Sequence, residues 1–206
     1  MRDILVQNSL VSKKYLETIK AVDGVVQNLD YHQQRLESVL SFCENPKRHI
    51  LKDHLNPPQN GIYKCRVVYD ETELDVAYVK YEKRRVHSLK IVYNDEIEYS
   101  KKYLERDLLN ELFVLKDSCD DVLIVKSGLI TDTSIANIAF YDGEKWLTPK
   151  RPLLKGTTRQ RYLESNKIVE RDIFVDDIKE FSKVALMNAM IDFDIIPIYN
   201  IEEVIC

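Results

Sequence analysis

A chain of 206 residues is long enough to bury most of its apolar surface in one large domain or two small ones. Hydrophobic residues make up 45% and charged residues 31%, with only 5 glycines and 6 prolines, which excludes a fibrous or disordered chain and favours a compact α/β or α+β protein. Because 34 acidic residues are interspersed with 30 basic ones, for a net charge of -4, no sustained positive field is available to attract nucleic acid.

The N-terminal segment, MRDILVQNSLVSKKYLETIK, contains no apolar stretch of the length that a signal peptide requires, and no later segment approaches ~18 consecutive apolar residues. Four cysteines are scattered without CxxC or CxxH spacing, which favours reduced thiols over zinc ligands or disulfides: Cys43, Cys65, Cys119 and Cys206. These features predict a cytoplasmic protein without a metal site and without a membrane partner.

The first predicted elements are a β-hairpin and a helix. Residues 15–29 alternate in the manner of two short strands, and Asp23-Gly24 readily supplies the positive φ of a hairpin turn. Asp30 is the expected N-cap of a helix whose apolar residues recur at helical spacing through Leu36, Val39 and Leu40. We expect this helix to end before Asn45-Pro46.

The rest of the chain predicts strands with intervening helices. Residues 61–99 hold three or four β-rich segments, which predict a small, mostly antiparallel sheet. Residues 102–117 have a helical pattern, strand candidates follow at 121–132, 137–149 and 183–198, and a second helix is expected to start near Gly156. We therefore expect an α+β fold with an N-terminal α+β lobe over residues 1–95 and a β-rich lobe over residues 96–206.

Three motifs carry residues suited to chemistry. The stretch SGLITDTSIANIAF gathers Asp132, Thr133, Ser134 and Asn137 between apolar segments, where an ordinary buried strand needs no polar groups. Gly156-Thr157-Thr158 opens a helix and could hold a phosphate, although such a motif alone is more often a capping turn. Lys101 and Lys102 are adjacent lysines that are either solvated or, for one buried in a site, able to bond to an aldehyde.

Taken together, five motifs resemble the class IV pyridoxal-phosphate aminotransferases in order and rough spacing, and they look closest to the aminodeoxychorismate lyase branch. The resemblance runs from Glu17 to Pro197 and rests on these segments: ETIKAVDGVVQNLDYHQQRLESV, KKYLER, TDTSIANIAFYDGEKWLTP, PLLKGTTRQRYL and ALMNAMIDF. It implies a fold-type IV, D-amino acid aminotransferase-like enzyme whose C-terminal lobe is β-barrel-like and carries most of the cofactor site. It also implies pyridoxal 5'-phosphate as the cofactor and a homodimer.

The resemblance also implies roles for single residues. Lys102 matches the family's Schiff-base lysine, with Lys101 as the second candidate. The residues implied at the cofactor's phosphate are Arg35, the Gly156, Thr157 and Thr158 turn, and a second turn at Asn188 and Ala189. Asp132 stands where the family has a glutamate that bonds to the pyridine nitrogen, and it is one methylene shorter; Asn137 and Ser134 would support this turn at the ring.

The implied activity is conversion of 4-amino-4-deoxychorismate to 4-aminobenzoate and pyruvate. A transaminase acting on branched-chain or D-amino acids requires the same lysine, so these motifs do not separate the two enzymes. A third hypothesis is a cofactor-free relative that acts as a binding protein. Taken singly, His32 and Arg35 are also explained as the polar face of an amphipathic helix; the order in which the motifs occur is what favours an enzyme.

Overall fold

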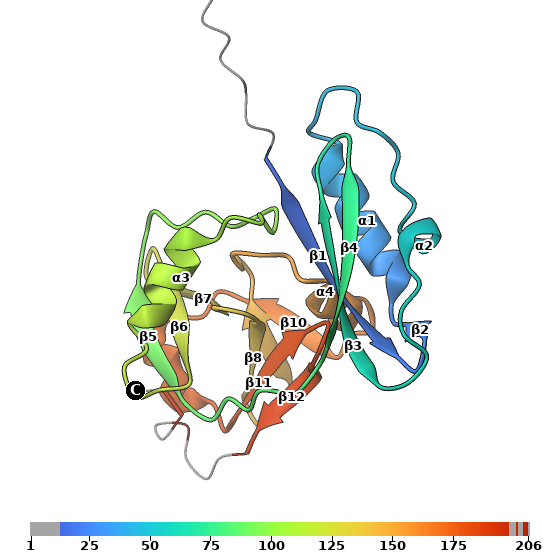
Figure 1. Ribbon diagram of the computed structural model, residues 1–206. Coiled ribbons are helices and arrows are strands. Elements are labelled where there is room, and N and C mark those ends of the chain that lie inside the picture. Colours follow the sequence, from blue (N-terminus) through green and yellow to red (C-terminus); the bar gives the residue numbers. More distant parts are fainter. Residues whose placement is uncertain (1–12, 198–200, 202–203, 206) are drawn as a thin grey trace, which may run out of the picture.

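The computed structural model describes residues 13–197, 201, 204 and 205. Most of the polar N-terminal segment and Cys206 lie outside these residues. Figure 1 shows two lobes, each built around its own sheet, with the helix α4 (Thr157–Glu164) where they meet. No helix in the described part of the chain is long and apolar enough to cross a membrane.

The first lobe contains a four-stranded antiparallel sheet in the order β2-β1-β3-β4. Its strands are β1 (Tyr15–Val22), β2 (Val25–Val26), β3 (Ile62–Tyr69) and β4 (Leu74–Lys80). The predicted hairpin is confirmed, because β1 pairs with β2 across Asp23 and Gly24, whose φ angles are 46° and 79°. This sheet supplies one wall of the candidate site through β1 and β3.

Helix α1 (Leu29–Leu40) packs its apolar face on this sheet, and the short helix α2 (Leu51–His54) follows it. The helix begins after Asn28, in the left-handed region at φ 51°, so the expected N-cap at Asp30 is wrong and Asp30 lies in the first turn. Asn tolerates this backbone better than most residues. The helix ends at Leu40, ahead of Asn45-Pro46 as predicted.

The second sheet has the order β10-β9-β8-β7-β6-β5, with β11 pairing to β8 and to β12. Its strands are β5 (Leu89–Tyr93), β6 (Asp121–Lys126), β7 (Leu129–Thr133), β8 (Asn137–Tyr141), β9 (Trp146–Pro149), β10 (Ile168–Arg171), β11 (Lys183–Asn188) and β12 (Asp192–Ile196). The strand pattern after residue 121 is thereby confirmed. The expected assignment of residues 61–99 to one sheet is wrong for β5, which pairs in parallel with β6 and buries Leu89 and Val92 in the second lobe. The lobe boundary near residue 95 stays a prediction.

The barrel-like form expected for the C-terminal lobe is not found. Among the described strands, β8 pairs with β7, β9 and β11, and no ladder joins β10 or β12 to β5. A barrel requires the sheet to close on itself, whereas this sheet branches at β8 and stays open. The fold is α+β, with the branched sheet curving beside the first lobe (Figure 1).

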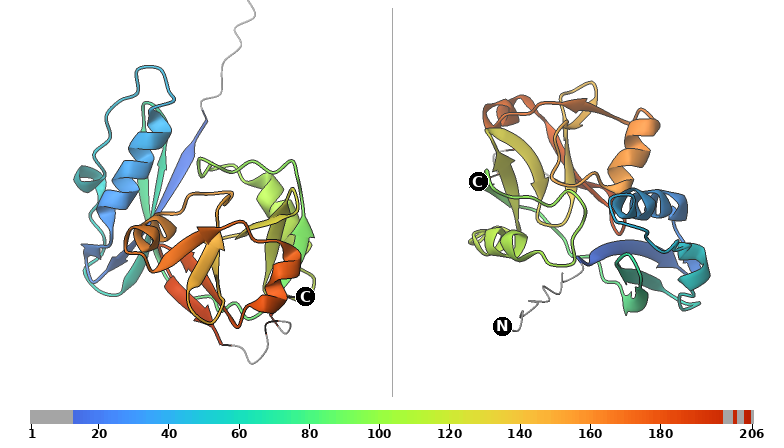
Figure 2. Two further views of the ribbon diagram at one scale, coloured as in Figure 1. Left: turned by 180° about the vertical axis from the view of Figure 1, so that it is seen from behind. Right: turned by 90° about the horizontal axis from the view of Figure 1, so that it is seen from above.

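Three short helices complete the second lobe. Helix α3 (Asp107–Val114) begins later than predicted, because Lys102 has a φ of 52° that does not continue an α-helix. Helix α4 begins after Gly156 as expected, and η1 (Val175–Glu180) is a 3₁₀-helix. The right-hand view of Figure 2 shows α4 beside α1, and the Tyr31 hydroxyl of α1 donates a 2.6 Å hydrogen bond to Glu164 of α4.

Candidate active site

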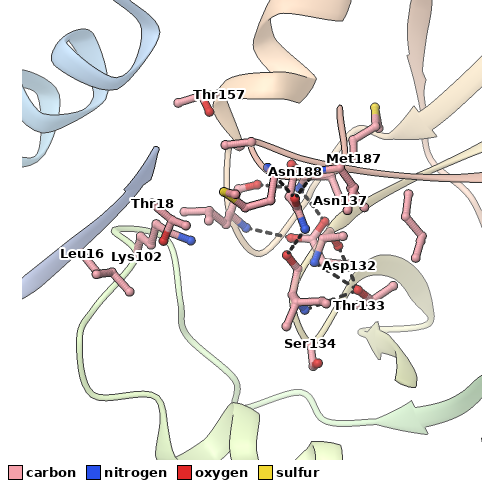
Figure 3. A pocket seen from close by; sticks show the side chains of 18 of the residues that line it. Leu16, Thr18, Lys102, Asp132, Thr133, Ser134, Asn137, Thr157, Met187 and Asn188 are labelled. Atoms are coloured by element: carbon pink, nitrogen blue, oxygen red, sulfur yellow. Dashed lines mark hydrogen bonds between the residues drawn. The ribbon is translucent and has the colours of Figure 1, made fainter. Parts of the chain in front are cut away.

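A cavity of about 290 Å³ lies between the two lobes and gathers most of the predicted site residues. Those that line it are Arg35, Lys102, Asp132, Asn137, Gly156, Thr157, Asn188 and Ala189. Thr158 is buried but does not line the cavity. Figure 3 shows Lys102 beside Thr18 on one wall, across from Asp132, Asn137 and Asn188.

Lys102 lies where the two lobes are hydrogen-bonded to each other. Its carbonyl accepts a 3.0 Å bond from the Leu16 N–H of β1, and its φ of 52° is unusual for a residue other than glycine. Burial and the neighbouring Arg35 guanidinium lower the pKa of Lys102 to about 8, although Glu17 acts in the opposite direction. The neutral, nucleophilic amine is therefore accessible near neutral pH.

Lys101 is placed differently from its neighbour. Its ammonium lies 3.8 Å from the ring centroid of Phe42, and Lys101 is not among the residues that line the cavity. A cation over an aromatic ring is a favourable arrangement for a charged lysine. Of the two adjacent lysines, only Lys102 is positioned to react with a ligand in the cavity.

Asp132 is a buried carboxylate whose partners are neutral. Its Oδ1 accepts a 2.7 Å bond from the Asn137 amide, and its Oδ2 accepts a 2.9 Å bond from the Leu154 N–H. Burial raises the pKa of Asp132 to about 6, although these two hydrogen bonds lower it. No cation of the described chain lies within ion-pair distance of it, so the carboxylate can take a cationic partner from a ligand.

The remaining polar residues of SGLITDTSIANIAF shape the turn that carries Asp132. The Thr133 hydroxyl oxygen accepts a 3.1 Å bond from the Ala136 N–H, and Arg106 donates a 2.8 Å bond to the Ser134 carbonyl. The Asn137 amide also donates a 2.8 Å bond to the Leu154 carbonyl. These bonds hold β7, β8 and the loop before α4 in one arrangement, with Asp132 at its centre.

Glycine is required at position 156 because the Asn137 side chain lies against its backbone. A Cβ added there would lie 2.1 Å from the Asn137 Oδ1, far inside van der Waals contact. Any larger residue would displace Asn137 and, through it, Asp132. The backbone at Gly156 is extended, with φ -69° and ψ 144°, so the requirement comes from space and not from conformation.

Two chain segments offer N–H groups to an anion. Helix α4 starts at Thr157 on the cavity wall, and the first N–H groups of a helix have no intrahelical acceptor. Asn188 closes a turn by accepting bonds from the N–H groups of Met190 and Ile191, at 2.9 Å and 3.1 Å. Its side chain is thus used within the turn, and the next residue, Ala189, also lines the cavity.

Sequence reasoning missed Glu17, which anchors Arg35. Glu17 is fully buried on β1, and Arg35 Nε and Nη2 donate bonds of 2.7 Å and 2.5 Å to its two oxygens. His32 is buried too, and its Nδ1 lies 2.6 Å from Glu17 Oε2. The sequence signal was the two-residue periodicity of a strand. Glu17 lies two residues from Tyr15 and two from Ile19, so its side chain points to the same face of β1 as these core residues.

The cavity wall has an excess of positive charge. Six lining residues are basic and two are acidic. The basic residues are Arg35, Lys64, Arg66, Arg84, Lys102 and Arg106; the acidic ones are Asp132 and Asp194. Lys64 and Arg66 lie two residues apart on β3 and form no ion pair within the described chain. In a protein of net charge -4, this wall selects for anionic ligands.

The chain belongs to the class IV aminotransferase family: the family model described as amino-transferase class IV matches residues 80–201. An uncharacterized protein of Haemophilus influenzae is 38% identical over 180 residues, which cover 84% of this chain and 96% of that protein. A crystal structure from Haemophilus somnus 129pt, described as a "putative 4-amino-4-deoxychorismate lyase", is 35% identical with a TM-score of 0.80, covering 86% of this chain and 96% of the other.

A more distant structure shares the fold. A hypothetical aminotransferase from Mycobacterium tuberculosis, in its PLP-bound form, is 16% identical with a TM-score of 0.74 and covers 91% of this chain and 81% of its own. Enzymes of this family typically bind pyridoxal phosphate. The residues around the cavity fit that group: an amine of lowered pKa, a carboxylate with no cationic partner, and N–H groups at a helix start are the donors and acceptors that an aldehyde, a pyridine nitrogen and a phosphate require.

Proposed function

We propose that this protein is a pyridoxal-phosphate-dependent lyase that converts 4-amino-4-deoxychorismate to 4-aminobenzoate and pyruvate. The observation that carries the proposal is that Lys102 and Asp132 lie across one cavity from each other. In the lining of that cavity, basic side chains outnumber acidic ones. The likeness to the Haemophilus somnus structure supports the lyase over other reactions of the family.

The cavity residues divide the work of holding the cofactor. Arg35 and the start of α4 at Gly156 and Thr157 would bind the phosphate, since a guanidinium and helix N–H groups both donate to phosphate oxygens. Asp132 would accept a hydrogen bond from the protonated ring nitrogen. When bound, pyridoxal phosphate supplies an electron sink for the carbon that loses its proton.

Lys102 is the proposed base. Its pKa of about 8 leaves a substantial neutral fraction at physiological pH, so its Nζ can accept the proton from the substrate carbon that carries the amine. Loss of the enolpyruvyl group then leaves an aromatic ring, and a proton returned to the departing methylene carbon completes pyruvate. The left-handed backbone at Lys102 and its bond to Leu16 fix the point from which the amine extends.

The positive wall suits the substrate's charge. 4-Amino-4-deoxychorismate carries two carboxylates, and the cavity offers cations beyond Arg35 and Lys102. Lys64 and Arg66 on β3 have no acidic partner in the described chain, and the two hydrogen bonds that the Arg106 side chain donates there go to neutral oxygens. These cations suit a dicarboxylic ligand, a description that fits 4-amino-4-deoxychorismate and also the 2-oxoglutarate that a transaminase would accept, so product analysis separates the two enzymes.

The first experiment measures the visible absorption spectrum of the purified protein with pyridoxal phosphate, for wild type, Lys101→Ala and Lys102→Ala. We expect a visible band in wild type and Lys101→Ala and its loss in Lys102→Ala, because only Lys102 lines the cavity. Absence of the band from wild type contradicts both enzyme hypotheses and favours the cofactor-free binding protein.

The second experiment separates the two enzymes. Wild type is incubated with 4-amino-4-deoxychorismate, and separately with a panel of branched-chain and D-amino acids plus 2-oxoglutarate. Formation of 4-aminobenzoate and pyruvate in equal amounts supports the lyase. Glutamate formation from the amino-acid panel, without 4-aminobenzoate in the first assay, assigns a transaminase instead.

A further inference from the structure

The strongest unexplained feature near the cavity is the buried cluster of Glu17, His32 and Arg35. Glu17 has an exposed fraction of 0%, and the Arg35 side chain is 13% exposed. One carboxylate accepts from both partners: Arg35 donates through Nε at 2.7 Å and Nη2 at 2.5 Å, and His32 Nδ1 lies at 2.6 Å. This is a two-point contact between a planar guanidinium and a carboxylate, which fixes orientation as well as distance.

The protonation states of the cluster follow from its geometry. Burial alone would raise the pKa of Glu17, but the Arg35 charge and the hydrogen bonds from His32 and Arg35 lower it to about 2. Glu17 is therefore ionised and can only accept hydrogen bonds, so the proton in the 2.6 Å contact belongs to His32 Nδ1. Burial lowers the pKa of His32, which makes the ring neutral. The cluster as a whole has no net charge.

Arg35 keeps donors for a second partner. A guanidinium has five N–H groups, and the contact with Glu17 uses those of Nε and one of Nη2. Arg35 is also part of the cavity lining, whereas Glu17 and His32 are not. The Glu17 carboxylate therefore occupies the Nε–Nη2 edge of the guanidinium, and the remaining N–H groups are the ones available to an anion in the cavity.

We propose that Glu17 is a positioning residue that, supported by His32, holds Arg35 in the orientation in which it binds the anionic group of the ligand. The identity of that group as the cofactor's phosphate rests on the proposed function; the orientation of Arg35 does not. Glu17 also offsets part of the effect that the Arg35 charge has on the Lys102 amine.

The orientation is tested in the cofactor-free protein. The hydrogen-exchange rate of the Arg35 Nε–H is measured by NMR in wild type and in Glu17→Gln. The glutamine amide has one acceptor oxygen and turns its NH₂ toward an arginine donor, so we expect the exchange rate to rise at least tenfold. Asp70→Asn is the matched control, because Asp70 is a buried carboxylate beside β3 that does not line the cavity.

The binding consequence is tested with pyridoxal phosphate and, separately, with inorganic phosphate. We expect Glu17→Gln to raise the Kd of pyridoxal phosphate about tenfold, which corresponds to ~1.4 kcal/mol. In an Arg35→Lys background the same change should have little further effect, because Glu17 acts through the guanidinium. A purely structural ion pair would change the melting temperature but would give additive or no effects on Kd.

The outcomes separate the two proposals. Unchanged Arg35 exchange in a folded Glu17→Gln protein, or fully additive effects in the double variant, would overturn the positioning role. If wild type binds no pyridoxal phosphate, the proposed function fails, and the exchange rate still decides the role of Glu17. If Glu17→Gln does not fold, Glu17→Asp replaces it: the shorter carboxylate keeps the charge but loses the two-point contact, so the same changes are expected at smaller size.

Discussion

Two buried carboxylates, one in each lobe, have pKa values that differ in opposite directions from their ordinary values. Glu17 on β1 has a pKa lowered to about 2: burial acts to raise it, but the Arg35 charge and the hydrogen bonds from His32 and Arg35 together outweigh burial. Asp132 on β7 has a pKa raised to about 6, because burial outweighs hydrogen bonds from neutral donors. The difference is a cation within ion-pair distance, which Glu17 has and Asp132 lacks among the described residues, and it distinguishes a carboxylate already paired within the protein from one that awaits a ligand.

This contrast separates scaffold from binding site within one cavity. The first lobe brings a completed ion pair whose arginine lines the cavity, and the second lobe brings an acid whose hydrogen-bond partners are neutral. Changes around Glu17 should therefore have different consequences from changes around Asp132. Four variants test this contrast, in order of decreasing expected effect.

The largest expected effect is on stability in the first lobe. Glu17→Gln leaves a buried guanidinium without a counterion, which should cost about 3 kcal/mol of unfolding free energy at pH 7. Since the folded pKa of Glu17 lies below its ordinary value of 4.5, its stabilising contribution is complete above pH 4.5 and is lost as pH falls toward 2. Urea unfolding at pH 7 and pH 3 measures both; an equal gap between wild type and variant at the two pH values contradicts the ion-pair account.

The next effect concerns the support of Asp132. Gly156→Ala places a Cβ against Asn137 and should cost about 2 kcal/mol by overpacking, together with weaker binding of pyridoxal phosphate. Gly143→Ala is the control: its φ of 104° strains an alanine, but nothing lies within 4 Å of the added Cβ. It should lose stability without a change in the Kd of pyridoxal phosphate, as measured by fluorescence titration. Equal Kd values for both variants would contradict the role of Gly156.

Asp132 itself predicts a pH dependence of binding. Its carboxylate is charged above pH 6 and loses its attraction for a protonated ring nitrogen below that value. In a Lys102→Ala background, which removes covalent attachment, pyridoxal phosphate affinity should fall about tenfold per pH unit below 6. The double variant with Asp132→Asn shows the pH dependence that comes from the cofactor's own ionisable groups. If the single and double variants have the same pH profile of affinity, Asp132 does not contact the ring nitrogen.

The smallest effect is a gain. Lys102→Met removes an amine whose charged form is disfavoured by burial, and should stabilise the cofactor-free protein by about 1 kcal/mol at pH 7. Because the folded pKa is about 8 and the ordinary value is 10.5, the penalty is full below pH 8 and absent above pH 10.5, so the gain should shrink at high pH. Lys101→Met, at the Phe42 ring, should give no such gain in thermal unfolding.

Sequence patterns predicted most elements because their signals are local. The Asp23-Gly24 turn, the periodicity through Leu36 and the Gly156 helix start each depend on a few neighbouring residues. The placement of β5 was missed because its parallel partner, β6, lies some thirty residues later and alternation does not specify a partner. The branch at β8 was missed for the same reason.

The candidate site was partly predictable for a different reason. Ordered motifs identified Lys102, Asp132, Asn137 and Gly156, and the structure brings them to one cavity. His32 was read as the polar face of a helix, yet it lies four residues before Leu36 on the buried face. Its burial depends on Glu17, fifteen residues away on another element, and such a pairing is visible only in three dimensions.

The bond between Leu16 and Lys102 has a mechanical consequence. Together with the bond from the Leu104 N–H to the Lys14 carbonyl, it forms a short bridge through which the strand of one lobe is joined to the segment that carries the amine. Lys102 thus moves with both lobes at once. Because the segment that carries the amine is hydrogen-bonded to β1, a change in the angle between the lobes would change the distance from the Lys102 amine to Asp132.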